Sequence, residues 1–397
     1  MMKSPVRVAI IGAGPAGLCL AQGLKKQGIT AQVYEKNAAL SPRHQGYRLR
    51  IDAIGQAALA QCLPASLFEL FIASCAAPAT VQTLDAELNA VSEKWVDHWH
   101  RTPHQPDLRA DRQLLRELLM TDLDGQLHFA KALSRYEWLP DQSIAAYFED
   151  GSVAVADILV GADGVHSSVM ALRFPGLQAV DTGEVCCYGK TLLNQATCNA
   201  IAAKLQTGTS VIFEQGLAVV VDVMRFAATT AHTAWHPPHD YIYWALIGKR
   251  ARFGVAADDN LRYTDAQLRG LIASLSRSWP AELRALFELA APQAAMLVPV
   301  RSMPRIAPWP ATQVTAIGDA LHVMSPASGL GVNAALFDAA SLSSAIAEIY
   351  RGTMSLLQAI TEHENRVRAH SFAAVELSGK GNWQLFGESQ AHQGAEQ

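Results

Sequence analysis

Charged residues, cysteines and long apolar runs are all scarce in this chain, and each scarcity argues against a class of protein. Charged side chains make up 17% of the 397 residues and apolar ones 50%, a balance that argues against an intrinsically disordered chain. The net charge of −4 comes without a lysine or arginine stripe, so a nucleic-acid partner is not expected. No apolar stretch is long enough to cross a bilayer, so a membrane partner is not expected either.

The six cysteines form no Cys-x-x-Cys pair, which argues against a disulfide framework and against a cysteine zinc site. The adjacent Cys186 and Cys187 would point to opposite faces of a strand, and we expect free thiols there rather than a vicinal disulfide. Residues 1–24 imitate a signal peptide, but glycines and a proline interrupt their apolar run. These features predict a cytoplasmic protein.

Histidines occur in two groups that invite a metal site. Both groups lie in proline-containing loops, and neither has Cys or acidic ligands at a recognised spacing, so we expect no metal. The histidines of the two groups are His98, His100, His104, His232, His236 and His239.

The beginning of the chain has the pattern of a β-α-β unit. Residues 6–11 and 31–34 are short apolar runs that predict strands, and residues 15–27 between them predict a helix. The turn before the helix is a G-x-G-x-x-G, in which Gly12 makes the tight turn, Gly14 admits a pyrophosphate and Gly17 lets the helix pack on the sheet. Glu35 follows the second strand, where a carboxylate can accept hydrogen bonds from a ribose diol and would repel a ribose phosphate. The pattern predicts a site for FAD or NAD rather than NADP; the alternative is a glycine-rich turn with a surface glutamate.

Three further segments resemble the para-hydroxybenzoate hydroxylase family, the class A flavoprotein monooxygenases, and its compact single-component members in particular. Residues 157–167, Asp-Ile-Leu-Val-Gly-Ala-Asp-Gly-Val-His-Ser, resemble the Asp-Gly segment of the family. Residues 316–326, Ala-Ile-Gly-Asp-Ala-Leu-His-Val-Met-Ser-Pro, with their continuation to residue 338, resemble its Gly-Asp segment. Arg112, with Leu115 and Arg116, resembles the arginine that opens a helix between these motifs. The resemblance spans residues 6–342.

The resemblance implies bound FAD. In the Gly-Asp segment, Asp319 would hold a ribityl hydroxyl, and a helix beginning near Asn333 would point its positive end at the flavin. Asp163 could instead be a turn cap, Arg112 could be a solvated helix start, and Met170 stands where the family has a basic residue. The cofactor-binding residues that the motifs predict are Gly12, Gly14, Ala16, Gly17, Glu35, Lys36, Gly46, Arg112, Asp163, Gly318, Asp319, Pro326, Gly329, Gly331, Val332 and Asn333.

A single dinucleotide fingerprint argues for a monooxygenase rather than a reductase, because flavin disulfide reductases carry a second fingerprint and a redox cysteine pair. The W-x-W-x-I-P segment of flavin halogenases is also absent. The resemblance implies that NADH or NADPH reduces the flavin and leaves, and that O2 then forms a flavin C4a-hydroperoxide that hydroxylates an aromatic or polycyclic small molecule. An oxidase, dehydrogenase or cyclase without oxygen insertion fits the motifs equally well, and a non-enzymatic FAD-binding module is a third interpretation. No catalytic side chain is assigned.

The expected fold is α/β, with a glutathione-reductase-type FAD-binding Rossmann domain, an inserted α+β substrate domain and a C-terminal helical segment, in a monomer or homodimer. The predicted FAD domain is discontinuous and comprises residues 1–75, 107–181 and 296–345. Residues 76–106 and 182–295 would form the substrate domain, with one helical insertion, and residues 346–397 a helical tail.

Aromatic residues on the strands of the predicted substrate domain suit the wall of a pocket for a flat, apolar substrate. Each of them could equally be an ordinary core side chain of the sheet. Arg225 could bind a substrate carboxylate or phenolate, or could be a solvated surface arginine. The pocket candidates are Tyr188, Phe213, Arg225 and Tyr243.

Overall fold

A computed structural model describes residues 6–39, 46–77, 80–91, 106–214, 216–227 and 239–386, the last seven by their backbone alone. Five histidines of the two groups (His98, His100, His104, His232 and His236) and most of residues 76–106 lie outside the described residues. In the described part of the chain, no helix is long and apolar enough to cross a membrane. Within the same residues, no group of three or more metal-ligating side chains occurs.

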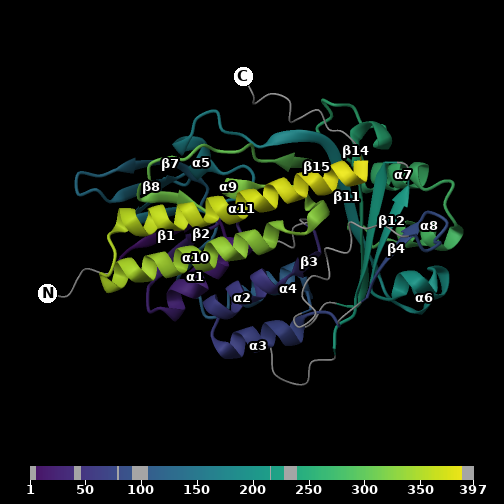
Figure 1. Cartoon of the computed structure of the whole chain (residues 1–397), viewed down its shortest axis with the longest axis horizontal. Coiled ribbons are helices and arrows are strands. Elements are labelled where there is room, and N and C mark those ends of the chain that lie inside the picture. The colour runs from purple at the N-terminus through teal and green to yellow at the C-terminus, as the bar shows by residue number, and fades with distance from the viewer. Residues whose placement is uncertain are drawn as a thin grey trace.

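A five-stranded parallel sheet forms one half of the molecule, in the order β16-β10-β1-β2-β6 (Figure 1). Every residue of β1 and β10 is buried, as expected for strands of a parallel sheet that is covered on both faces. The sheet is built from distant parts of the sequence. Its strands are β1 (Val8–Ile11), β2 (Ala31–Tyr34), β6 (Leu127–His128), β10 (Ile158–Gly161) and β16 (Val314–Ala316).

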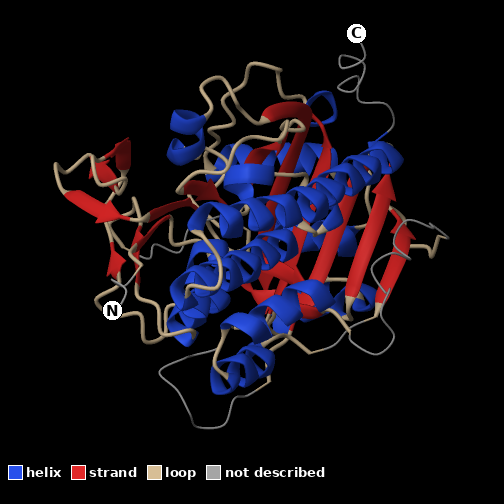
Figure 2. Cartoon of the chain, turned by 60° about the vertical axis from the view of Figure 1, so that its left-hand side comes forward, coloured by secondary structure: helices blue, strands red, loops and turns tan. Residues whose placement is uncertain are grey.

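Helices cover one face of this sheet, and a three-stranded antiparallel sheet covers the other (Figure 2). Alternation along β1 sends Ile10 toward the helices, and Ala9 and Ile11 toward the small sheet. Helices α10 and α11 lie side by side along the molecule (Figure 1). The elements are α1 (Pro15–Lys26), α2 (Ala53–Cys62), α3 (Ala65–Ser74), α4 (Arg112–Leu119), α10 (Gly331–Arg351), α11 (Leu356–Phe386), β7 (Leu133–Trp138), β8 (Ile144–Phe148) and β9 (Val153–Ala156).

A six-stranded sheet, in the order β15-β11-β14-β13-β12-β4, forms the other half of the molecule. Its outer face packs against α7 and α8, and Trp244 lies over Gly189 there, where a Cβ would come within 2.3 Å of the indole ring. Its inner face contacts Ala327, in the short 3-10 turn η4 (Pro326–Ser328) of the Gly-Asp segment. The strands are β4 (Val81–Asp85), β11 (Val180–Leu192), β12 (Thr209–Glu214), β13 (Leu217–Met224), β14 (Tyr241–Lys249) and β15 (Met296–Ser302), and the helices are α6 (Gln195–Ala200), α7 (Asp265–Leu275) and α8 (Ala281–Glu288).

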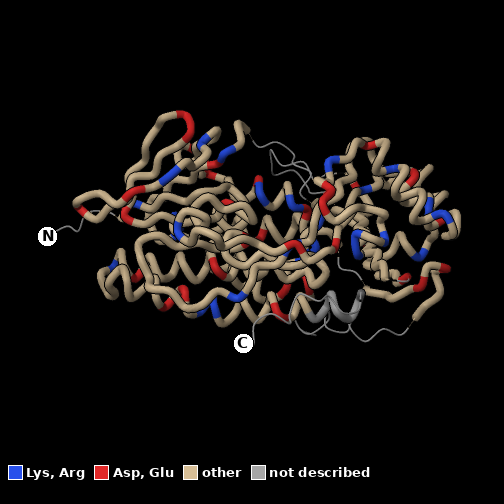
Figure 3. The backbone as a smooth tube through the Cα atoms, turned by 90° about the horizontal axis from the view of Figure 1, so that it is seen from above, with Lys and Arg blue, Asp and Glu red and all other residues tan. Residues whose placement is uncertain are grey.

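A buried cluster of charges joins the two halves. The two-stranded ribbon of β3 (Arg48–Ile51) and β5 (Leu108–Asp111) brings Arg48 and Arg109 to Asp222 of β13, at 2.5 Å and 2.7 Å. Asp222 has no exposed surface. Acidic and basic residues are interspersed along both halves of the described chain (Figure 3).

The expected fold class is confirmed, and so is the alternation of the two cysteines: Cys186 belongs to the inner face, Cys187 to the outer face, and both are free thiols. The expectation of one helical insertion between residues 182 and 295 was wrong, because α6, α7 and α8 all lie there. The sequence analysis also missed β7, and α10 begins at Gly331 rather than near Asn333. The domain boundaries given above stay predictions.

Candidate cofactor and substrate site

The motif loops meet at one edge of the parallel sheet, because β1, β2, β10 and β16 are adjacent and their carboxyl ends lie together. The Gly12 N–H donates to the Tyr34 carbonyl at 2.8 Å, and a Cβ on Gly12 would lie 2.3 Å from the Ala162 carbonyl oxygen. A Cβ on Gly318 would lie 3.3 Å from the Ala16 Cβ. The three segments that carry the sequence motifs therefore line one continuous region.

The beginning of α1 is open toward this region. Gly14 caps the helix without a side-chain hydrogen bond, and a Cβ on Gly14 would meet no atom within 4 Å. Its first turn carries no acidic residue that would occupy the positive end of the helix. A helix end of this kind fits a pyrophosphate.

Glu35 is held by the G-x-G-x-x-G loop itself. Its side chain is buried and accepts hydrogen bonds from the backbone N–H groups of Ala13 and Asn37, both at 3.0 Å, and from the Asn37 side chain. Arg116 lies 3.8 Å from the carboxylate, and its Nε donates to the Ala13 carbonyl at 2.8 Å. Arg116 entered the sequence analysis only as part of a motif, and the structure adds it to the residues that shape this loop.

Arg112 and Gly46 lie on the side of the site that faces the six-stranded sheet. The backbone N–H of Arg112 donates to the Tyr47 carbonyl at 2.8 Å. The positive charge of Arg112 works to lower the pKa of the Tyr188 phenol, against the larger effect of burial. Gly46 has a φ of +77°, which favours glycine, and a Cβ on it would meet no atom within 4 Å. Lys36, by contrast, is exposed beside the Glu35 loop.

Asp163 binds the beginning of a short helix whose N-cap residue is Ser167. Its carboxylate accepts hydrogen bonds from the Ser167 hydroxyl at 2.5 Å and from the Ser168 N–H at 2.7 Å, at the beginning of α5 (Ser168–Arg173). Burial raises the pKa of Asp163, although these hydrogen bonds oppose the shift. These hydrogen bonds fit the turn cap that the sequence analysis kept as an alternative, and a contact of Asp163 with FAD stays a prediction.

The Gly-Asp segment carries one exposed and one buried carboxylate. Asp319 begins the short helix α9 (Asp319–His322) with its side chain exposed, and within the described ranges its carboxylate makes no hydrogen bond or ion pair. Asp338 is fully buried, accepts the Gly318 N–H at 2.9 Å and pairs with His322. Burial lowers the pKa of His322, but the Asp338 carboxylate outweighs burial, so the net shift is upward.

Asn333 ties the turn after Pro326 to the ribbon between the two halves. Its amide donates to the carbonyls of Arg50 and Gly329, at 3.0 Å and 3.1 Å, and its oxygen accepts the Asp52 N–H at 3.0 Å. Gly329 has a φ of +63°. Helix α10 begins at Gly331, and no side chain caps it. Its first backbone N–H groups can therefore donate to a ligand. Gly331 and Val332 are half-buried at this helix end.

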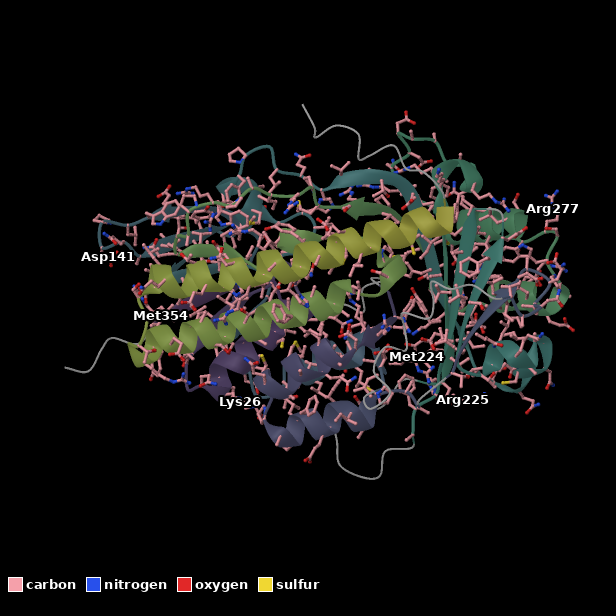
Figure 4. The ribbon with its side chains drawn as sticks, viewed as in Figure 1. Lys26, Asp141, Met224, Arg225, Arg277 and Met354 are labelled. Atoms are coloured by element: carbon pink, nitrogen blue, oxygen red, sulfur yellow. The ribbon has the colours of Figure 1, made fainter. Side chains whose placement is uncertain are left out.

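Three of the four pocket candidates share the inner face of the six-stranded sheet. Tyr188, Phe213 and Tyr243 belong to one apolar cluster, and Ala327 of the Gly-Asp segment packs into it. Burial raises the pKa of the Tyr188 and Tyr243 phenols. Arg225 lies beyond the end of β13, at the lower end of the sheet in Figure 4. The Arg225 side chain is half exposed, and its guanidinium lies 3.8 Å from the Asp240 carboxylate. This position favours a surface arginine over a substrate-binding one.

The sequence analysis missed two residues of this inner face. Tyr47 packs edge-on against Tyr188 and Tyr241, with ring centroids 6.5 Å and 6.4 Å apart, and donates its hydroxyl to the Ala294 carbonyl. Lys190 follows Tyr188 by two positions on β11, and its Nζ lies 4.5 Å from the centre of the Tyr47 ring. The two-residue period of a strand was the available signal for Lys190.

Fold and site define a flavoprotein with one dinucleotide motif. Residues 10–58 match the NAD(P)-binding Rossmann-like domain, and residues 283–374 match the FAD binding domain. The chain is 33% identical to the dual O-methyltransferase/FAD-dependent monooxygenase CTB3 of Cercospora beticola, over 96% of the chain and 46% of that protein. It is 38% identical to the FAD-dependent monooxygenase thnD of Trichoderma harzianum, over 41% of the chain and 40% of that protein.

Solved structures show the same fold along the chain. A crystal structure assigned as an FAD-containing monooxygenase of Photorhabdus luminescens matches with a TM-score of 0.82 and 28% identity, over 96% of this chain and 98% of that one. The Klebsiella pneumoniae HpxO complex with FAD and uric acid matches with a TM-score of 0.78 and 20% identity, over 96% of this chain and 89% of that one. The chain spans about half the length of the first curated relatives it matches. In motifs, fold and sequence, the chain is similar to FAD-dependent monooxygenases over almost its whole length.

Proposed function

We propose that the protein is an FAD-dependent monooxygenase that uses NADH or NADPH and O2 to hydroxylate an aromatic or polycyclic small molecule. The observation that carries this proposal is the contact between the Gly-Asp segment and the aromatic inner face of the six-stranded sheet. Ala327 packs into the cluster of Tyr188 and Tyr243, so a flavin held by that segment would face an aromatic wall.

The open helix ends and the exposed carboxylate of Asp319 fit FAD. The first turn of α1 would hold the pyrophosphate, Glu35 the adenosine ribose and Asp319 the ribityl chain, while the beginning of α10 would face the flavin ring. Asp163 and Asn333 would act through the loops that they fix. The remaining residues proposed to contact FAD are Gly12, Gly14, Ala16, Gly17, Lys36, Gly46, Arg112, Gly318, Pro326, Gly329, Gly331 and Val332.

FAD bound in these loops would supply the redox chemistry that links NADH or NADPH to O2. The protein contributes orientation and exclusion of water. The aromatic inner face would hold a flat substrate against the cofactor loops, and the apolar residues around it would keep water away from the reacting atoms. We assign no side chain as a catalytic acid or base.

We test the function with purified protein, which should be yellow because of bound FAD. A substrate screen should reveal compounds that stimulate NADH or NADPH oxidation. The product should gain one oxygen atom, about 16 mass units with ordinary O2 and about 18 with 18O-labelled O2. Stimulated turnover without 18O in the product would identify the oxidase or dehydrogenase alternative. A colourless preparation that does not take up added FAD would refute the proposal.

We further propose that the protein works in the cytoplasm as a monomer or homodimer. The six free thiols fit a reducing compartment. Size-exclusion chromatography with light scattering would determine the oligomeric state.

A further inference from the structure

Lys190 places a positive charge on the aromatic inner face. It follows Cys186 and Tyr188 at every second position of β11, so the three side chains point to the same side of the sheet. Its Nζ lies 4.5 Å from the centre of the Tyr47 ring and 5.3 Å from the centre of the Tyr241 ring. The ammonium group therefore lies beside two neighbouring aromatic rings of the inner face, whose centres are 6.4 Å apart.

This charge has no anionic partner in the described part of the chain. Lys190 pairs across the sheet with Tyr243, and Tyr243 pairs with Asp222. The backbones of Lys190 and Asp222 are therefore two strands apart, or about 10 Å. Asp222 is already bound by Arg48 and Arg109. The other buried carboxylate nearby, Asp111, accepts the Tyr241 hydroxyl at 2.9 Å and caps α4.

Aromatic rings alone compensate such a charge poorly. The attraction between a cation and an aromatic ring offsets only a small part of the hydration that an ammonium group loses when it is withdrawn from water without an anion. Lys190 is half-buried. An uncharged side chain at position 190 would pack on the same rings at no electrostatic cost. We therefore take the charge of Lys190 as a sign of an anionic ligand.

The position of Lys190 relates this charge to the cofactor loops. Tyr47, the ring beneath the ammonium group, follows Gly46 directly, and its carbonyl accepts the N–H of Arg112. Ala327 of the Gly-Asp segment packs into the inner-face cluster that contains Tyr47. A flat molecule on this face could thus place one oxygen at Lys190 while its ring lies toward the flavin side.

We propose that Lys190 determines substrate specificity by binding an anionic oxygen, a carboxylate or an ionised phenol or enol, of an aromatic substrate. The proposal rests on the proposed monooxygenase function and names its substrate class. A neighbouring ammonium group favours the ionised form of an acidic hydroxyl, whose proton leaves to water. The resulting anion is more electron-rich, which suits attack by an electrophilic oxygen.

Two matched pairs of probes test the proposal on the FAD-loaded protein. They are 1-hydroxy-2-naphthoate with its carboxamide, and 2-hydroxy-1,4-naphthoquinone with its methyl ether. Binding is followed through the visible absorption of the oxidised flavin, without turnover. We expect at least one acidic probe to bind about tenfold or more tightly than its neutral partner, as one hydrogen bond between charged groups allows. The pair that shows the preference distinguishes a carboxylate from an enolate.

Lys190→Gln should reduce this preference to about twofold or less, and Lys190→Arg should retain part of it, with FAD binding unchanged in both. Lys249→Gln removes an equal charge from the exposed end of β14 and should leave the preference intact. A preference that persists in Lys190→Gln but is lost in Arg225→Gln would overturn the proposal in favour of Arg225. Wild-type protein that binds acidic and neutral probes alike, or binds neither, would also overturn it. Failure to bind FAD or to insert 18O would instead refute the proposed function itself.

Discussion

At the scale of single residues, Asp319 and Glu35 are carboxylates of the same proposed site in opposite environments. Asp319 is exposed and unpartnered among the described residues, so it contributes little to the folded state on its own. We expect Asp319→Ala to raise the FAD dissociation constant by about 10–100-fold, the value of one or two charge-assisted hydrogen bonds. Fluorescence titration of the apoprotein measures the affinity, and the thermal midpoint of the apoprotein should not change. Unchanged affinity would show that the ribityl chain does not bind there.

Glu35 should behave differently because it already accepts backbone hydrogen bonds from Ala13 and Asn37. Replacing it with alanine leaves those buried donors without an acceptor, so the apoprotein should lose about 1–3 kcal/mol of unfolding free energy as well as FAD affinity. Urea denaturation of the apoprotein separates the two effects. If Glu35→Ala weakened only FAD binding, the loop would not depend on this carboxylate as the structure indicates.

The motif residues were predictable from the sequence. For the six-stranded sheet, the sequence identified only some of the side chains that share its inner face. Gly12, Gly14 and Glu35 occur at fixed spacings, because a tight turn and a ribose-binding carboxylate require them there. Lys190 was missed because the register of β11 against β14 decides which side chains it meets, and sequence alone does not give that register. Arg225 was chosen for its charge alone, and its partner Asp240 could not be foreseen.

At the scale of secondary-structure elements, the β3–β5 ribbon depends on one buried carboxylate. Asp222→Ala would leave the guanidinium groups of Arg48 and Arg109 buried without their shared anion, so we expect a loss of about 3–5 kcal/mol of unfolding free energy. Asp240→Ala removes a partly exposed carboxylate that lies 3.8 Å from Arg225 and accepts the Phe226 N–H at 3.0 Å, and it should cost only about 1–2 kcal/mol. Urea denaturation of both variants checks the contrast, and equal losses would contradict it.

Long or strongly periodic elements were predictable, and short ones in the middle of the chain were not. The strands predicted at residues 6–11 and 31–34 and the helix predicted at residues 15–27 lie within two residues of β1, β2 and α1, because glycines and apolar runs mark their ends. The helices α6 and α8 span six and eight residues, too few for a clear helical period. They are recognisable only once their apolar residues, such as Leu283 and Leu286, are seen against the outer face of the sheet.

At the scale of the whole molecule, the two sheets need each other for the proposed function, since neither carries both parts of the site. The parallel sheet brings together the three motif segments of the proposed FAD site, and the six-stranded sheet supplies the proposed aromatic wall. The order of the motifs along the sequence was sufficient to predict the first assembly. The second requires Ala327 and Tyr47 to reach the wall, and such contacts between distant segments have no local signal in the sequence.

The packing of α11 on α10 makes the stability of the whole molecule depend on pH through His363. Its ring is buried, its Nδ1 lies 3.1 Å from the Ser341 hydroxyl, and burial lowers its pKa to about 4, although Asp338 opposes the shift. The unfolded chain takes up this proton near pH 6.5, so the contribution of His363 is complete above pH 6.5 and is lost as the pH falls toward 4, by at most about 3 kcal/mol. His322, with its raised pKa, has the opposite sign, because its contribution is lost as the pH rises above 6.5. We therefore expect the unfolding free energy of His363→Gln, measured by urea denaturation between pH 4.5 and 8, to fall less steeply than that of the wild type on the acid side only. Parallel curves for the two proteins would mean that His363 is protonated in the folded state or reaches water there.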